Sequence, residues 1–265
     1  MIKLENYEVL GWEHAIRGMR NPMNSWEKSD SKHCSETLLC RECPAFEDDN
    51  KCHIRGSGID PLAIGPNDHD LMMRLASAGP VHGKFRRMIT VYVDITAPLY
   101  WWKEFDTYKV GTVANSCSTM HKIHAKEFEL SDFSTDHLVG SSLDYMNYLM
   151  RELNGWRTRY LATKDKEDWW QMIQLLPSSY NQKRTVQLNY EVLANMYEYR
   201  KAHKLDEWVE FCKWIETLPY SEIITAGLPA VIEPEPVVSG KGKGPNGVVR
   251  PEEDIKKYGN AVRGE

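Results

Sequence analysis

Strict alternation of apolar and more polar residues at 89–95 constrains the fold of this chain more than any other feature. Ile89, Val91, Val93 and Ile95 fall on every second position, with Thr, Tyr and Asp between them. Successive side chains of a strand point to opposite sides, so this pattern predicts a strand with one buried face. A sheet that is covered on one side is therefore expected.

Helical spacing of apolar residues predominates in the second half of the chain. It predicts helices at about 141–153, 165–175, 184–203 and 205–218. In the first half, helices are expected at 12–20 and from Asn67 to the Gly79-Pro80 pair, and Thr96-Ala97-Pro98 is expected to open an aromatic-rich helix that ends at Gly111. Together these patterns predict an α/β (α+β) fold.

Composition limits the classes of function that the chain can have. Its 265 residues and 42% hydrophobic content are enough for a substantial core, and its net charge is −5. Coating a nucleic acid or an anionic membrane needs a basic excess, so neither role is expected. Charged residues throughout the first thirty positions argue against a signal peptide or a membrane span, which predicts a cytoplasmic protein.

Changes of composition divide the chain into three parts. Residues 31–66 are polar, rich in Cys, Gly, Pro and Asp, and lack periodicity, which indicates an insertion within a domain spanning 1–228. Residues 229–265 are rich in Pro, Gly and Lys and are expected to form a flexible tail, because they have little apolar surface to bury. The Gly/Lys run in this tail does not follow a strand and lacks the Gly-Lys-Ser/Thr ending of a phosphate loop.

Four of the six cysteines lie close together in the insertion. Cys34, Cys40, Cys43 and Cys52 could hold one structural zinc ion through four thiolates, and an iron–sulfur cluster would use the same ligands. Only the Cys40-x-x-Cys43 pair has a familiar metal spacing, so free thiols are nearly as well supported, and a redox pair is the least favoured reading. A metal would supply folding energy to a segment that has few apolar residues.

Two polar features could carry chemistry. The stretch 107–122 is rich in hydroxyl, amide and lysine side chains, which could bind an anionic group or could simply form a solvated loop. Asn189 and Arg200 are eleven residues apart, about three helical turns, so on a helix at 184–203 both would face one ligand. The alternative for Arg200 is a surface ion pair.

The order of these pieces along residues 1–218 resembles the flavin-dependent thymidylate synthases. Four stretches carry the resemblance: Ala15–Arg20; Gly79-Pro-Val-His82 with the strand that follows and Ala97-Pro98; Lys103–Lys109 through Thr112, Asn115 and Ser118; and Leu176-Pro177, Tyr180, Thr185, Asn189, Leu193, Tyr197, Arg200 and Glu207-Trp208. The third stretch occupies the place of the family's signature Arg-His-Arg, Ser, Asn, Ser, Arg, Tyr.

This resemblance implies both a fold and an activity. The fold would have a central, mostly antiparallel sheet flanked by long helices, in a homotetramer with sites between subunits. The activity would be methylation of deoxyuridine monophosphate (dUMP) or a related pyrimidine nucleotide, with a folate as one-carbon donor, reduced FAD as hydride source and NADPH to recharge the flavin. In such chemistry the protein mainly positions the reactants and stabilises charge.

The resemblance also implies roles for single residues. His82 matches the family's active-site histidine near the flavin, and Ser118 matches the signature serine beside the uracil. Glu104 stands where a glutamine flanks the nucleotide, and Arg200 would hold the nucleotide itself. The flavin would be lined by four residues: Thr107, Tyr108, Lys109 and Asn189.

The signature arginines are mostly replaced in this sequence. Lys109 keeps one cation of Arg-His-Arg, whereas Met120 and Glu191 stand where the family has arginines. Each lost arginine removes charge-assisted hydrogen bonds worth roughly 1.5–3 kcal/mol, so compensating cations are expected from Arg86, Arg87 and Lys122. The alternative is a non-catalytic protein that keeps the fold and binds a nucleotide or a flavin.

Overall fold

The computed structural model describes residues 2–33 and 62–226. All of these fall within the expected domain at 1–228. The end of that domain, the tail at 229–265 and most of the insertion lie outside the described residues.

A four-stranded antiparallel sheet forms the centre of the fold. Its strands are β1 (Lys3–Leu10), β4 (Thr90–Pro98), β6 (Asn181–Asn189) and β5 (Val113–Ser116), in the order β1-β4-β6-β5. Val91 pairs with Leu188 and Val93 with Val186, and all four side chains are buried. The alternation at 89–95 therefore does mark a strand with one buried face, and the predicted fold class is confirmed.

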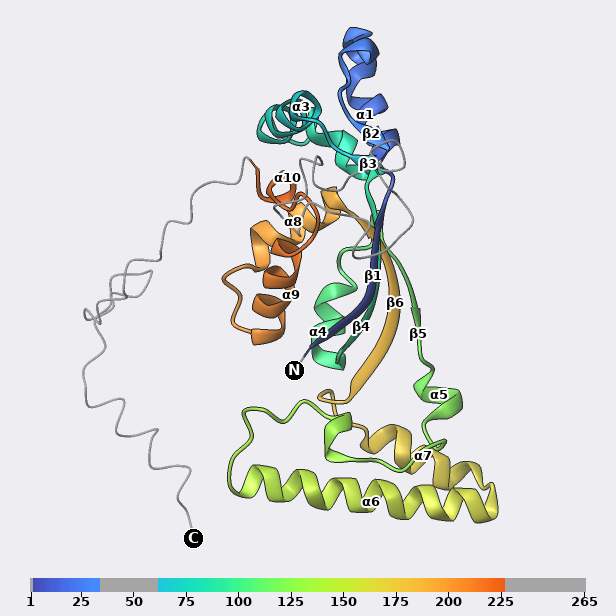
Figure 1. The fold of residues 1–265 in the computed structure, drawn as a ribbon. Helices are drawn as coiled ribbons and strands as arrows, with labels where there is room; N and C mark the ends of the chain where they lie inside the picture. The colour runs from blue at the N-terminus through green and yellow to red at the C-terminus, as the bar shows by residue number, and fades with distance from the viewer. Residues whose placement is uncertain (1, 34–61, 227–265) are drawn as a thin grey trace, which may run out of the picture. The chain divides into compact units, whose positions relative to one another are not determined.

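Helices cover one face of the sheet and lie near both ends of its strands. Figure 1 shows α8 (Tyr190–Arg200) and α9 (Asp206–Glu216) beside the sheet, α1 (Trp12–Arg20) and α3 (Pro66–Ser77) near one end, and α6 (Ser141–Thr163) and α7 (Lys166–Leu175) across the other end. The remaining elements are short: η1 (Asn21–Met23), η2 (Trp26–Lys28), β2 (Lys32–His33), β3 (Leu62–Ala63), η6 (Gly83–Met88), α4 (Leu99–Phe105), α5 (Thr119–Lys122), η7 (Leu130–Asp132) and α10 (Glu222–Thr225).

Two groups of buried residues hold these elements together. The larger lies between the sheet and its covering helices, where Trp101 packs with its ring centroid 4.7 Å from that of Trp208 and 5.1 Å from that of Phe105. The smaller joins α6 and α7 through Leu153 and Met172, both fully buried. The aromatic-rich segment after β4 is thus part of the main core.

The expected helix at 184–203 is wrong at its start. Residues up to Asn189 form β6, in which Val186 and Leu188 are buried and Thr185 and Gln187 are exposed. Apolar residues two apart suit a strand, and this alternation overrides the helical spacing that begins further on. Asn189 therefore lies before α8 and not on it.

Three other parts of the chain differ from the sequence predictions. Thr96-Ala97-Pro98 belongs to β4 and pairs with Lys183, Gln182 and Asn181, so α4 begins only at Leu99. The polar stretch 107–122 is not all loop, because it contains β5 and α5. Strand β1 was not predicted, because its mixed polar and apolar residues show no clear alternation.

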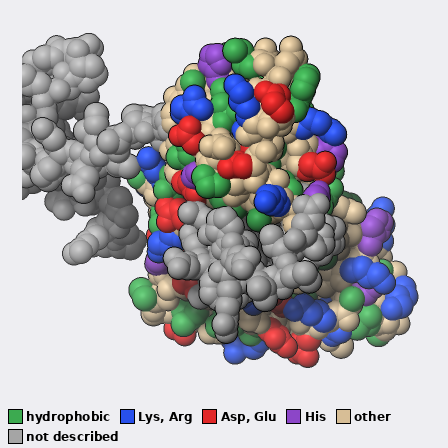
Figure 2. Space-filling model, turned by 45° about the horizontal axis from the view of Figure 1, so that its top comes forward, with side chains coloured by type: hydrophobic (Ala, Val, Ile, Leu, Met, Phe, Trp, Pro, Cys, Tyr) green, Lys and Arg blue, Asp and Glu red, His purple; other side chains and the backbone are tan. Residues whose placement is uncertain are grey.

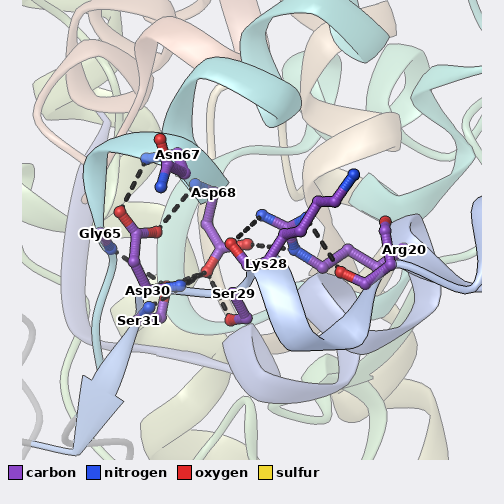
Figure 3. Close-up of polar contacts among 9 residues, drawn as sticks. Arg20, Lys28, Ser29, Asp30, Ser31, Gly65, Asn67 and Asp68 are labelled. Carbon is purple, nitrogen blue, oxygen red and sulfur yellow. Dashed lines mark hydrogen bonds and ion pairs between the residues drawn. The ribbon is translucent and has the colours of Figure 1, made fainter.

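A buried ion pair ties α1 to the start of α3. Arg20 Nε donates to Asp68 Oδ1 at 2.6 Å, and the two side chains are 5% and 0% exposed. Figure 3 shows Arg20 and the segment 29–31 converging on the Asp68 carboxylate, which also accepts hydrogen bonds from the Ser29 and Ser31 hydroxyls at 2.7 and 2.6 Å. Burial alone would raise the pKa of Asp68, but these hydrogen bonds outweigh it, so the pKa is lowered.

The N-terminus of α3 is capped from outside the helix. The Asp30 carboxylate accepts the backbone N–H groups of Asn67 and Asp68 at 2.9 and 3.1 Å (Figure 3). The helix was expected from Asn67, but it begins one residue earlier, at Pro66. The two ends of the segment 31–66 are therefore anchored to each other.

The surface carries both signs of charge. On the face drawn in Figure 2, Lys and Arg side chains are interspersed with Asp and Glu. None of the helices in the described part of the chain combines the length and the apolar character that a membrane span requires.

Candidate functional site

A cleft of about 630 Å³ lies where α3, η6, the turn at 110–111 and the start of α8 meet. Its lining combines the apolar side chains of Val110, Val192 and Ala194 with the polar side chains of Arg87 and Asn189. Clefts of this size and mixed lining are typical of small-molecule sites. The cleft is thus the leading candidate for a ligand site among the described residues.

Asn189 lines this cleft and is the N-cap residue that directly precedes helix α8. Its Oδ1 accepts the backbone N–H of Val192 at 3.0 Å, an N-cap contact that fixes the side chain. The amide nitrogen Nδ2 makes no hydrogen bond within the described residues, so it can donate to a ligand. A Cβ at Gly111, whose φ is +80°, would lie 3.0 Å from this nitrogen, so the turn approaches closely because residue 111 is glycine.

Charge in the cleft is partly cancelled within the protein. Arg86, expected to compensate for missing arginines, donates to Glu191 from Nε at 2.8 Å and from Nη2 at 2.7 Å, and to the Ile223 carbonyl at 3.2 Å. Arg87 is exposed and has no ion-pair partner in the described part of the chain. Of the two arginines, Arg87 is therefore the one whose charge is available to a ligand.

A second polar cluster surrounds Arg200. Its Nη1 donates to Glu104 Oε2 at 2.5 Å, its Nε donates to the Tyr108 hydroxyl at 2.9 Å, and its guanidinium lies 4.8 Å from the Trp208 ring centroid. Trp208 Nε1 donates to the same Glu104 oxygen at 3.1 Å. The structure thus joins three predicted site residues, and the Arg200 charge is already balanced by Glu104.

Ser118 lies in a different, smaller cavity of about 230 Å³. Its hydroxyl accepts the backbone N–H of His121 at 3.0 Å, which caps the short helix α5. The same cavity is lined by three lysines, Lys122, Lys126 and Lys183. The predicted catalytic serine is therefore beside a group of cations.

The remaining predicted residues occupy more exposed positions. His82 precedes η6 and its side chain is exposed, although the adjacent Gly79 and Pro80 line the larger cleft. The Thr107 hydroxyl donates to the Glu104 carbonyl at 2.7 Å, and Lys109 is exposed. Of the predicted residues, Asn189 thus lines the larger cleft, Glu104 and Tyr108 contact Arg200, and Ser118 lines the smaller cavity, whereas His82 and Lys109 line neither of these two cavities.

Sequence reasoning missed several residues at these sites. Lys183 comes together with Lys122 and Lys126 because β5 pairs with β6, which places distant residues side by side. Glu191 was recognised as replacing an arginine, but its pairing with Arg86 joins residues 105 positions apart. No local sequence signal could have indicated either arrangement.

The larger cleft fits the ring system of a flavin better than it fits the diphosphate. A flat aromatic ring matches the apolar walls at Val110 and Val192, and its polar edge matches the free Asn189 amide. Binding of a diphosphate is favoured by several available cations. In this cleft Arg87 is unpaired, but Arg86 is already bound to Glu191. The candidate zinc ligands Cys34, Cys40, Cys43 and Cys52 lie outside the described residues.

Comparisons with known proteins were made for both sequence and structure. No protein-family model matches the chain, and no curated protein matches it significantly. Two structures of the flavin-dependent thymidylate synthase from Helicobacter pylori, each with FAD and dUMP, are 16% identical to it, with TM-scores of 0.56 and 0.55. Each comparison covers 86% of this chain and 99% of the other.

A third structure is less similar. A UMP/dUMP methylase from Streptomyces cacaoi, bound to 5-bromo-UMP, is 12% identical over 62% of this chain and 83% of its own, with a TM-score of 0.45. The two Helicobacter pylori structures show that this chain has the fold of a flavin-dependent thymidylate synthase.

Proposed function

We propose that the protein is an FAD-dependent enzyme that methylates a pyrimidine nucleotide, dUMP or a close relative, with a folate as one-carbon donor. The observation that carries the proposal is the 630 Å³ cleft, in which a free amide, an unpaired arginine and a close glycine turn meet, in a chain with this fold. Its lining suits a flat, polar-edged ring. Bound flavin would supply the hydride that reduces the transferred carbon to a methyl group.

The residues of the chain would act by binding and orienting the reactants. Asn189 would donate a hydrogen bond to the polar edge of the flavin ring, and Arg87 would attract a phosphate of the cofactor. Arg200 is held by Glu104 and Tyr108, so it would present its remaining N–H groups to the pyrimidine in a fixed direction. Fixed donors of this kind accelerate a reaction by positioning.

His82, Thr107, Lys109 and Ser118 keep their predicted roles within the proposal. We propose the homotetramer, with NADPH as reductant, as part of the same function. Size-exclusion chromatography with light scattering tests the tetramer directly. A chain that stays monomeric with FAD bound would remove that part of the proposal.

The proposed function is tested by flavin binding and by methyl transfer. Purified protein should be yellow or become yellow with FAD, and with folate donor and NADPH it should release the C5 hydrogen of dUMP, measured with tritium. Asn189→Asp keeps the N-cap but replaces the amide donor by an acceptor, so FAD binding should weaken while the fold is retained. Asn147→Asp, on helix α6, is the matched control and should leave binding unchanged.

The second candidate is a binding protein without turnover. It is favoured by the Arg86–Glu191 pair, which removes one cation from the cleft. Protein that binds FAD and dUMP but releases no tritium would establish this candidate. Protein that binds neither would contradict both.

A further inference from the structure

His203 lies beside Arg200 in the turn that follows helix α8. Its backbone N–H donates to the Arg200 carbonyl at 3.0 Å, so the turn holds the two side chains next to each other. His203 Nε2 lies 2.9 Å from Arg200 Nη1 and 3.4 Å from Glu104 Oε2. The side chains of Arg200, His203 and Glu104 are 18, 24 and 35% exposed, so water has limited access to these contacts.

Two donors approach the imidazole of His203 from different sides. The Leu205 backbone N lies 3.2 Å from Nδ1, and Arg200 Nη1 lies 2.9 Å from Nε2. A neutral imidazole has one acceptor nitrogen, so only one of these contacts can be a hydrogen bond at a time. A hydrogen bond from a charged donor is roughly twice as strong as one from a neutral donor. The proton of the imidazole is therefore assigned to Nδ1, and Nε2 accepts from Arg200.

The donors of Arg200 are divided between the protein and a ligand. A guanidinium carries five N–H groups, one on Nε and two on each terminal nitrogen. The Nε–H donates to the Tyr108 hydroxyl, and the two Nη1 hydrogens are taken by Glu104 and His203. The Nη2 hydrogens have no partner in the part of the chain that the structure describes. Only the Nη2 edge is thus left for a ligand, in a direction that these side chains fix.

We propose that His203 is a positioning residue, which holds Nη1 of Arg200 so that the Nη2 edge alone is presented to the pyrimidine. The role of Arg200 toward a pyrimidine rests on the proposed function, whereas the contact between His203 and Arg200 rests on the geometry of the turn. Without the imidazole, one Nη1 hydrogen would be free and the guanidinium would lose one of its anchors. Arg200 would then spend less time in the orientation that the reaction needs.

Two substitutions of His203 separate this role from a purely structural one. Asparagine reaches only as far as Nδ1, so in His203→Asn the amide oxygen can accept the Leu205 N–H, but nothing replaces the bond to Arg200. Glutamine reaches as far as Nε2, so in His203→Gln the amide oxygen can accept from Arg200. A residue that only shaped the start of α9 would be rescued by asparagine, whereas a residue that positions Arg200 is rescued by glutamine. His14→Asn, at an exposed position on α1, is the matched control.

The experiment uses the full chain and two readouts. Hydrogen exchange of the Arg200 Nε–H, followed by NMR of protein labelled with nitrogen-15 arginine and assigned through Arg200→Lys, reports on the anchoring of the guanidinium without any need for activity. Steady-state kinetics with dUMP give kcat and KM. We expect His203→Asn to speed the exchange and to lower kcat roughly ten-fold each, with a smaller change in KM, and His203→Gln to restore most of both. His14→Asn should change neither.

Two results would overturn the proposal: exchange and kcat in His203→Asn equal to those of the unaltered protein, or a natively folded His203→Gln that is no closer to the unaltered protein than His203→Asn. The two readouts also separate this proposal from the proposed function. Protein without methyl transfer, in which the exchange still follows the expected order, would contradict the proposed function and support the contact between His203 and Arg200. Active protein in which neither substitution changes exchange or kcat would do the reverse.

Discussion

The Arg86–Glu191 pair predicts an unusual gain of cofactor affinity. Glu191 accepts two hydrogen bonds from Arg86 at the wall of the larger cleft, and so withholds that cation from a ligand. Glu191→Gln keeps a side-chain oxygen that can accept one of these bonds, so the guanidinium stays in position. Its charge is then no longer balanced, and a phosphate of FAD can take the place of the lost carboxylate.

The size of the effect follows from the burial of the pair. The Arg86 and Glu191 side chains are 7% and 18% exposed, so the ligand-free variant should lose about 3 kcal/mol of unfolding free energy through an unpaired, nearly buried charge. A charge-assisted bond to phosphate is worth about 1.5–3 kcal/mol, which corresponds to a roughly ten-fold or larger increase in FAD affinity.

Fluorescence titration with FAD and with riboflavin measures this directly. FAD binding should tighten in Glu191→Gln, whereas riboflavin, which has no phosphate, should bind as it does to the unaltered protein. Glu198→Gln removes another carboxylate from the same cleft and controls for the general change of charge. Equal changes for FAD and riboflavin, or unchanged FAD binding despite lower stability, would refute this reasoning.

Three further predictions concern stability and reactivity. Arg20→Met leaves Asp68 buried without its cation and should lower the unfolding free energy by about 3–5 kcal/mol in urea titrations; a loss below about 1 kcal/mol would contradict the buried pair. The Thr185 hydroxyl, with Asn6 and Lys183, lowers the pKa of Asp94 to about 2. The contribution of ionised Asp94 to the unfolding free energy is therefore complete above about pH 3.9 and is lost as the pH falls toward 2. Asp94→Asn should reduce the fall of the unfolding free energy between about pH 4 and pH 2. An unchanged pH dependence in this range would contradict the prediction. Burial raises the pKa of the Cys212 thiol to about 12, so iodoacetamide should label Cys212 only after unfolding, and native labelling would show that the thiol is accessible.

The central strand and most helices could be predicted because their signals are local. The alternation at 89–95 shows its two faces within a few residues, and helix α1 was predicted with the bounds 12–20 that it has. The start of β6 was misassigned because its alternation is brief and runs directly into a longer helical pattern. Capping by Asp30 likewise could not be foreseen, since it links residues 37 apart.

Several residues of the candidate site could be named from the sequence, but their spatial arrangement could not. Arg200, Glu104 and Tyr108 were each named as site residues, and Arg200 does contact the other two. Asn189 and Ser118 were also named, yet they line two separate cavities. Which charges remain available depends on pairing across the fold, as Arg86 and Arg87 illustrate, and that pairing is set by the tertiary structure.

A crystal structure of the protein soaked with FAD and dUMP tests the central claim most directly. Electron density for the flavin ring should fill the cleft between Gly111 and Asn189, within hydrogen-bonding distance of the Asn189 amide. A crystal saturated with both ligands that shows this cleft empty, with the flavin bound elsewhere, would contradict the claim.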